Sequence, residues 1–189
     1  GDYLIPVGQA LKEKVGSDYM DKQEDFWLKD VRKFATDAMM TLIRGDLAVL
    51  GIHMDTFFSE KSLYGGGKIE KAIESLKSNN LIYDGILDSP KGKKVEDWEP
   101  RNQTLFKSTS HGDDVDRPIK KSDGAWTYFA PDIAYHFDKI ERNFDQLIDI
   151  FGADHGGYVK RMKAAVAALS DDKVKFDIKL TQLVRLFER

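Results

Sequence analysis

The sequence predicts an α/β fold in which strands of a parallel sheet alternate with covering helices. Three observations indicate this class. Apolar residues recur every three or four positions through long stretches, as in amphipathic helices. From residue 125 onward, short apolar runs alternate with helical patterns of roughly 10–15 residues, which is typical of parallel βαβ units. The chain of 189 residues is 41% hydrophobic and 11% aromatic, as in a globular protein.

Composition excludes several classes of protein. The chain has no cysteine, so disulfides and thiolate chemistry are absent, and four scattered histidines make a zinc site unexpected. A net charge of −3 provides no global basic field for nucleic acid, although a local patch stays possible. No apolar run approaches the roughly 20 residues of a membrane span, and the first residues lack a secretory pattern. We therefore expect a cytoplasmic protein.

Residues 1–59 are predicted to be mainly helical. Residues 3–15 carry apolar side chains at helical spacing, and Gly16 follows at a position where glycine commonly ends a helix. A second helical pattern covers residues 24–50. It predicts either one long helix or two helices broken near Gly45.

Residues 60–123 are predicted to form a small α+β subdomain. The three glycines of "SLYGGGKIEKAIESLKSNN" lead into a helix, and "LIYDGIL" has the pattern of a strand around an Asp-Gly turn. "TLFKST" is again strand-like, and "IKKSDGAWTYF" predicts a strand, a turn and a strand. The lysine-rich stretch at residues 90–95 is expected to be a mobile, solvated loop.

Residues 124–189 show the α/β alternation. Strands are predicted at 125–129, 146–151 and 174–180, with helices at 132–142 and 158–169. Parallel sheets of this kind bind ligands beyond the carboxyl ends of their strands. Those ends are "FAPD" and "FGADHGG" in this chain.

A tyrosine and an aspartate stand at the first of these strand ends. Tyr128 lies at the end of the predicted strand, and Asp132 opens the following helix four residues later. The carboxylate has two interpretations. It caps the helix and complements the helix dipole, or it pairs with a guanidinium or amine of a ligand. Tyr135, three residues further on, either shares this face or packs in the core.

The second strand end carries "GADHGG". Gly152 allows the backbone to approach a ligand closely, and Asp154 is an acidic residue where a ribose hydroxyl pair would bind. His155 is a potential donor to a phosphate or a base. A tight βα turn with an aspartate cap is an equally good interpretation, because the full GxGxxG pattern is absent.

Several other motifs are predicted to carry no chemistry. "GGGK" at residues 65–68 lacks the first glycine and the Ser or Thr of a phosphate-binding loop. "SHGDDVDR" at residues 110–117 lacks the spacing and the final glutamate of a calcium loop, so we expect a solvated or ion-paired loop. His53 and His111 are isolated and are expected to be surface or structural residues.

Taken together, four stretches resemble the arginyl-tRNA synthetases, a family of class I aminoacyl-tRNA synthetases, and in particular the bacterial branch. They are "GDYLIPVGQAL", "FFSEKSLYGGGK", "LTQLVRL" and the long run from "FKSTSHGDDVDRPIKKSDGAWTYFAPDIAYH" to "GADHGGYVKRMKAA". The resemblance implies a Rossmann-like parallel sheet that forms the second half of the catalytic core. An N-terminal helical segment (1–59) and an inserted α+β subdomain (60–123) would precede this half (124–189).

The same resemblance implies an activity and site residues. The family activates L-arginine with ATP, accompanied by Mg²⁺, to arginyl-adenylate and transfers arginine to tRNA(Arg). Tyr128 and Asp132 match the residues that hold the substrate guanidinium. Gly152, Asp154, His155 and, more loosely, Gln182 match the ATP-binding side. Because residues 90–95 would lie in the insertion, contact with the tRNA acceptor arm is an alternative to a solvated loop. Neither zinc, a tightly bound cofactor nor a membrane is implied, and the full-length enzyme is expected to be a monomer.

The two signature motifs of the family, HIGH and KMSK, are absent from the chain. Catalytic residues are therefore unassigned, and we expect the chain to be a central fragment that has no activity alone. One alternative is a non-catalytic, synthetase-like module that binds a small ligand or RNA. Another is a nucleotide-binding Rossmann protein without specificity for an amino acid.

Overall fold

A computed structural model describes residues 1–87, 101–185 and 187. The lysine-rich stretch at residues 90–95 lies outside the described residues. The chain divides into two compact units, Gly1–Phe57 and Phe58–Arg189. No helix in the described part of the chain is both long and apolar enough to cross a membrane.

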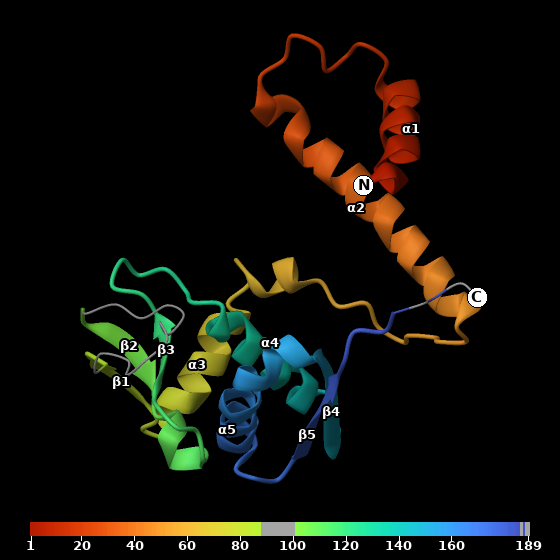
Figure 1. Cartoon of the computed structure of the whole chain (residues 1–189). Helices are drawn as coiled ribbons and strands as arrows, with labels where there is room; N and C mark the ends of the chain where they lie inside the picture. The colour runs from red at the N-terminus through yellow and green to blue at the C-terminus, as the bar shows by residue number, and fades with distance from the viewer. Residues whose placement is uncertain (88–100, 186, 188–189) are drawn as a thin grey trace. The chain divides into compact units, whose positions relative to one another are not determined.

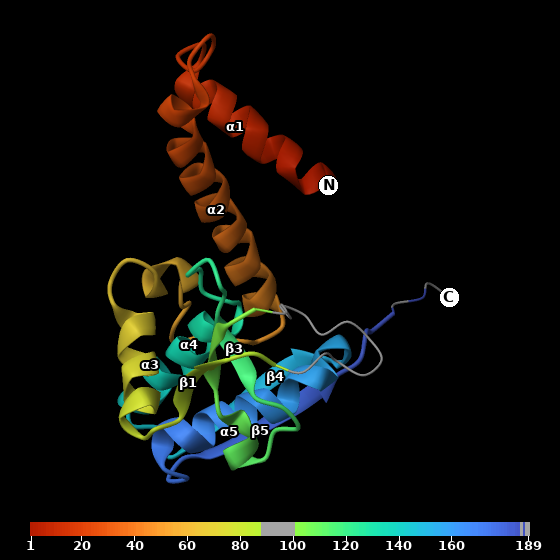
Figure 2. The same ribbon diagram turned by 90° about the vertical axis from the view of Figure 1, so that its left-hand side faces the viewer.

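The first unit consists of two helices (Figure 2). After a short 3-10 turn, α1 covers Ile5–Val15 and α2 covers Glu24–Val49. Gly16 caps α1 with a positive φ of 55°, which confirms the predicted helix end. Of the two predictions for residues 24–50, the single long helix is correct, because α2 continues through Gly45 without a break.

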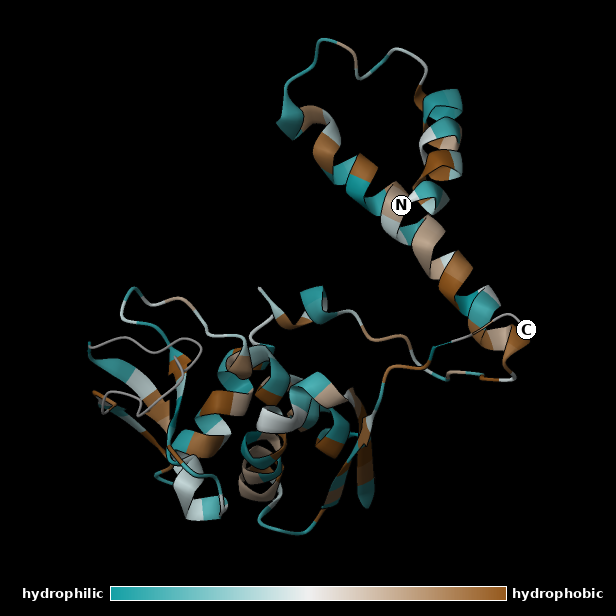
Figure 3. Ribbon diagram, viewed as in Figure 1, coloured by the Kyte–Doolittle hydropathy of each residue, from teal (hydrophilic) through white to brown (hydrophobic). Residues whose placement is uncertain are grey.

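Neither of these two helices, both fully described, contains a buried residue. Hydrophobic segments recur along α2 (Figure 3) and leave large apolar side chains such as Phe26 and Leu42 exposed. Helices without tertiary packing are marginally stable in water. We therefore expect amide protons of residues 5–49 to exchange with solvent much faster than those of residues 159–170, as measured by hydrogen–deuterium exchange of the chain. Equal protection of the two regions would contradict this prediction.

The first half of the second unit forms a three-stranded antiparallel sheet in the order β1-β2-β3. Its elements are η2 (Glu60–Leu63), α3 (Lys68–Ser78), β1 (Ile82–Gly85), β2 (Gln103–Phe106), η3 (Ser108–His111) and β3 (Arg117–Lys120). The Asp-Gly turn predicted within "LIYDGIL" is wrong. Asp84 and Gly85 belong to β1 and pair with Thr104 and Gln103.

The second half contains a parallel βαβ unit. Its elements are α4 (Phe129–Glu141), β4 (Gln146–Gly152), η4 (Ala153–Tyr158), α5 (Val159–Ser170) and β5 (Lys175–Thr181). β4 and β5 run side by side (Figure 2), paired in parallel from Gln146–Lys175 to Gly152–Thr181. The connection through α5 confirms the βαβ prediction for residues 146–180, with element ends within two residues of those expected.

The strand predicted at residues 125–129 is wrong. Of these residues only Trp126 forms a β-bridge, with Lys120, and Thr127 then donates its main-chain N–H to Ile119. Tyr128 already has a helical backbone conformation (φ −60°, ψ −23°), and α4 begins at Phe129. Pro131 fits this first turn because it lacks an N–H that the turn would leave unpaired.

Two consequences for the candidate site follow from this early helix start. Tyr128 is the N-cap residue of α4 and does not end a strand. Asp132 lies inside the first turns of the helix and is not its cap, so its carboxylate is free to contact other elements. In the described part of the chain, the parallel sheet therefore has two strands, where the sequence predicted three.

The core of the second unit is built by α3, α4 and α5. These helices pack against one another and lie between the two sheets (Figure 1). Apolar residues of all three helices are fully buried, and Ile119 and Ile178 join them from the two sheets; the helical ones include Ile69, Leu76, Ile133, Met162 and Ala165. This packing holds the start of α4 beside β4 and the start of α5.

Candidate functional site

A cavity of about 550 Å³ opens where α4, β4 and the start of α5 meet. Twelve residues line it: Tyr128, Asp132, Tyr135, His136, Lys139, Ile148, Asp149, Ile150, Phe151, His155, Tyr158 and Met162. Three of the predicted site residues, Tyr128, Asp132 and His155, are thus brought to one cavity. Tyr128 and Asp132 come from the start of α4, and His155 comes from η4.

Asp132 is the carboxylate of this cavity that α4 provides. Tyr158 donates a hydrogen bond from its hydroxyl to Asp132 Oδ2 at 2.5 Å. Burial raises the pKa of the Asp132 carboxyl, and the hydrogen bond from Tyr158 opposes this effect. A partly desolvated carboxylate of this kind favours a ligand that brings a positive charge and hydrogen-bond donors.

Tyr128 lies at the rim of the same cavity. Its side chain is 74% exposed, so a ligand could cover the ring without displacing a packed neighbour. A planar, delocalised cation such as a guanidinium stacks well on an aromatic face. Tyr128 and Asp132 together therefore offer an aromatic surface and a carboxylate to one ligand group.

His136, Lys139 and Asp149 form a cluster in the lining of the cavity. His136 Nε2 lies 2.7 Å from Asp149 Oδ2, and Lys139 donates to Asp149 Oδ1 at 2.7 Å. His136 Nδ1 lies 2.8 Å from the main-chain oxygen of Asp132. Burial opposes ionisation of Asp149, but its hydrogen bonds with His136 and Lys139 outweigh burial and hold the pKa of the carboxyl below its usual value. The cluster ties α4 to β4.

Sequence reasoning missed His136, Asp149 and Tyr158 as site residues. Two signals could have found the first pair. Asp149 shares one face of a predicted strand with Leu147 and Phe151, and a carboxylate on such an apolar face needs a partner. His136 follows Asp132 by four residues and therefore shares its helix face.

The residues predicted for nucleotide binding lie at the carboxyl ends of the parallel strands. Gly152 ends β4 and pairs with Thr181, which ends β5 and is followed by Gln182. Asp154 lies on η4 with its side chain 82% exposed, and His155 Nε2 is 3.5 Å from its carboxylate. The side chains of Asp154 and His155 are thus accessible at the sheet edge where parallel sheets bind ligands. Gly152, Asp154 and Gln182 do not line the cavity itself.

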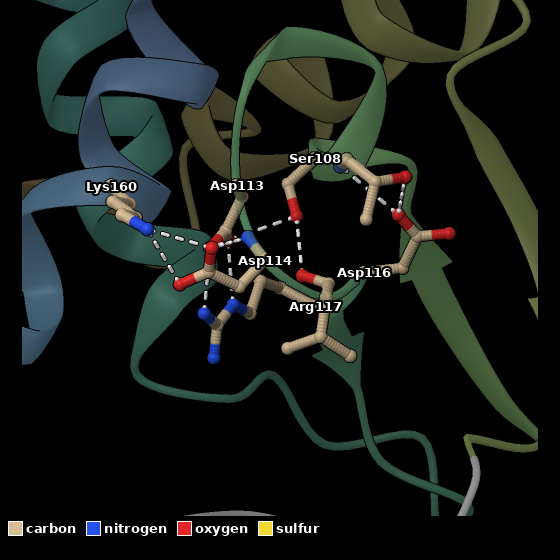
Figure 4. Close-up of polar contacts among 8 residues, drawn as sticks. Ser108, Asp113, Asp114, Asp116, Arg117 and Lys160 are labelled. Carbon is tan, nitrogen blue, oxygen red and sulfur yellow. Dashed lines mark hydrogen bonds and ion pairs between the residues drawn. The ribbon is translucent and has the colours of Figure 1, made fainter.

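Of the two expectations for the acidic loop, solvated or ion-paired, the structure shows the ion-paired one (Figure 4). Arg117 donates to both carboxylate oxygens of Asp113, at 2.6 and 2.7 Å, and both residues are buried. Ser108 lies 3.0 Å from Asp113, and Lys160 of α5 contacts Asp114. These pairs join the loop after η3 to β3 and α5. Among the residues described, no group of three or more His, Asp or Glu forms a metal-binding cluster.

The chain is highly similar to one group of enzymes. It is 73% identical to the arginine–tRNA ligase of Roseobacter denitrificans over 188 residues, which are 100% of this chain and 32% of that protein. It is 71% identical to the arginine–tRNA ligase of Jannaschia sp. over 98% of this chain and 32% of that protein. No family model matches the chain. This chain spans about a third of the length of the two ligases it matches.

A solved structure agrees with these sequences. A chain from Campylobacter jejuni described as a candidate arginyl-tRNA synthetase superposes with a TM-score of 0.77 and 33% identity. The match covers 97% of this chain and 36% of that one. The α/β arrangement is therefore that of part of an arginyl-tRNA synthetase. Over its whole length, the chain is homologous to one segment, about a third, of the arginine–tRNA ligases.

Proposed function

We propose that this chain is the arginine-recognising segment of an arginine–tRNA ligase that activates L-arginine with ATP and transfers it to tRNA(Arg). The observation that carries the proposal is the 73% identity to such a ligase along the entire chain. The cavity supports it, because an arginine side chain needs a carboxylate and a planar partner. Asp132 and Tyr128 both line the cavity and offer these two groups.

In this proposal Asp132 binds the guanidinium and supplies most of the selectivity. A buried carboxylate without a cation is destabilised, so amino acids that lack the guanidinium would leave an unfavourable site behind. Tyr128 covers the planar face of the group. Lysine has a positive charge but no fork of parallel donors, so it would satisfy this pair less well.

We assign the nucleotide side to the ends of β4 and β5, as part of a Rossmann-like core. Gly152 allows close backbone approach, Asp154 contacts the ribose hydroxyls, and His155 and Gln182 lie beside the base or phosphates. Mg²⁺ would enter with ATP, and no other cofactor is invoked. The reaction depends on positioning and on electrostatic stabilisation of the attack of the arginine carboxylate on the α-phosphate. We place the activity in the cytoplasm and expect the full-length enzyme to be a monomer.

A replacement experiment tests this function directly. The matching segment of the Roseobacter denitrificans ligase is exchanged for this chain, and the product is termed the chimeric ligase. It is expected to charge tRNA(Arg) with arginine at a rate within about tenfold of the parent enzyme, with ATP required. A folded chimeric ligase that binds ATP but forms no arginyl-tRNA would overturn the proposal. That result would favour a non-catalytic, synthetase-like module.

The isolated 189-residue chain is expected to show no arginine-dependent ATP–pyrophosphate exchange, with or without tRNA(Arg). The reason is that the chain lacks the HIGH and KMSK motifs, which in this family provide much of the phosphate contact. The assay compares the purified chain with a protein-free blank and with the chimeric ligase at equal concentration. Exchange well above the blank would show that the chain alone holds a complete catalytic site.

A further inference from the structure

We propose that Tyr158 is a positioning residue that orients Asp132 for the guanidinium of arginine. The inference rests on the proposed function. It goes beyond that function because it assigns a role to Tyr158 of η4, whereas the proposed arginine contacts, Tyr128 and Asp132, belong to the start of α4. Tyr158 donates its hydroxyl proton to Asp132 Oδ2 at 2.5 Å. Among the hydrogen bonds of the described residues, none reaches Asp132 Oδ1. The carboxylate is therefore held by one oxygen while the other is left for a ligand.

The tyrosine hydroxyl is itself held in place. The ring of Tyr158 packs edge-on against the buried ring of Phe129, with ring centroids 6.1 Å apart. The guanidinium of Arg161, a residue of α5, lies 4.6 Å from the centroid of the Tyr158 ring. Phe129 is at the start of α4, so the contact joins the first turns of α4 and α5. A donor fixed from two sides restricts the carboxylate rotamer more than water would.

Tyr158 also connects two parts of the proposed site. It is the last residue of η4, the turn that carries Asp154 and His155. Asp132 is 26 residues earlier on α4. The hydrogen bond therefore links the turn proposed to bind ATP with the carboxylate proposed to bind arginine. The placement of the arginine carboxylate against the α-phosphate depends on this spacing.

The hydrogen bond also favours the charged form of Asp132. Burial raises the pKa of this carboxyl, and Tyr158 is the strongest group acting in the other direction. Burial and the neighbouring Asp132 charge raise the pKa of Tyr158 well above its usual value, so the phenol keeps the proton it donates. Other charged or titratable groups around the carboxyl are Glu60, Tyr64, Tyr128, His136, Lys139, Asp149 and Arg161.

The test is Tyr158→Phe in the chimeric ligase, which removes one hydroxyl and keeps the ring. KM for arginine is expected to rise about tenfold, which corresponds to losing about 1.4 kcal/mol from a hydrogen bond to a charged group. KM for ATP is expected to change less than about threefold. Without the donor, the pKa of Asp132 rises further. The acid limb of kcat/KM for arginine should therefore move to higher pH.

Tyr83→Phe is the matched control, because it removes a tyrosine hydroxyl that donates to a carboxylate, Asp116 Oδ2 at 2.8 Å, outside the cavity. It should leave KM for arginine and the acid limb unchanged. The inference is overturned if Tyr158→Phe behaves like this control, or if it raises KM for ATP as much as KM for arginine, as a general loss of fold would. Asp132→Asn separates the two proposals. If that change leaves KM for arginine unaltered, the arginine site itself is wrong.

Discussion

Replacing Asp132 by asparagine in the chimeric ligase is expected to lower kcat/KM for arginine at least about 30-fold. Removing the charged partner of a buried, hydrogen-bonded ion pair costs about 2–5 kcal/mol or more, and tenfold corresponds to about 1.4 kcal/mol. The replacement has nearly the same shape, so the cavity is kept and only the charge is lost. Steady-state charging of tRNA(Arg) at varied arginine concentration measures the effect.

Asp154→Asn is the matched control for this experiment, because it makes the same chemical change on a carboxylate outside the cavity. Asp154 is exposed at the carboxyl end of β4 and is proposed to contact ATP. Its replacement should raise KM for ATP and leave KM for arginine within about threefold. Two results would contradict the assignment of Asp132. One is a decrease in kcat/KM for arginine of less than about tenfold in Asp132→Asn. The other is an equal decrease in kcat/KM for arginine and for lysine when the two amino acids compete.

Replacing Asp113 by asparagine is expected to lower the free energy of unfolding of the second unit by about 3–5 kcal/mol. The physical reason is the uncompensated charge that remains on Arg117. Asp113 also accepts the main-chain N–H of Asp114 at 2.7 Å and faces Ser108, so both of its oxygens are engaged (Figure 4). Urea unfolding of the chain, followed by circular dichroism, measures the difference.

The neighbouring pair of Asp114 and Lys160 is the natural control. The side chains of these two residues are 69% and 60% exposed. Exposed ion pairs contribute about 0–1 kcal/mol, so Asp114→Asn should change the unfolding free energy by no more than that. The expectation is contradicted if both variants lose a similar free energy of unfolding, or if Asp113→Asn loses less than about 1 kcal/mol. Either result would show that burial does not make the Asp113–Arg117 pair the stronger one.

The effect of Asp113 should also depend on pH. Burial opposes ionisation of this carboxyl, but the hydrogen bonds and charge of Arg117 outweigh burial and lower its pKa. A carboxyl whose folded-state pKa is lowered stabilises the fold above its unfolded pKa, which is about 3.9. That stability is lost as pH falls through the folded value. The difference between wild type and Asp113→Asn should therefore be constant near pH 7 and shrink below about pH 4.

Local patterns predicted most of the secondary structure. The apolar alternation of β4 and β5 and the helical spacing of α1 and α5 led to elements that the structure confirms. The failure at residues 125–129 has a physical cause. Trp126, Thr127 and Tyr128 all favour strands, but a strand needs a partner along its length. Here the pairing ends at Thr127, whose N–H donates to Ile119, and Tyr128 is already helical. Pairing is a tertiary property that propensity does not contain.

By itself, the sequence determined the βαβ unit, the candidate pair of Tyr128 and Asp132, and a strong resemblance to arginyl-tRNA synthetases. Helix and strand periods follow from backbone geometry, so a single chain reveals them. Only the tertiary structure decided that Asp132 is not a helix cap and that Tyr158 bonds its carboxylate. A contact between residues 26 positions apart depends on how α4 and α5 pack, and that packing leaves no periodic trace in the chain.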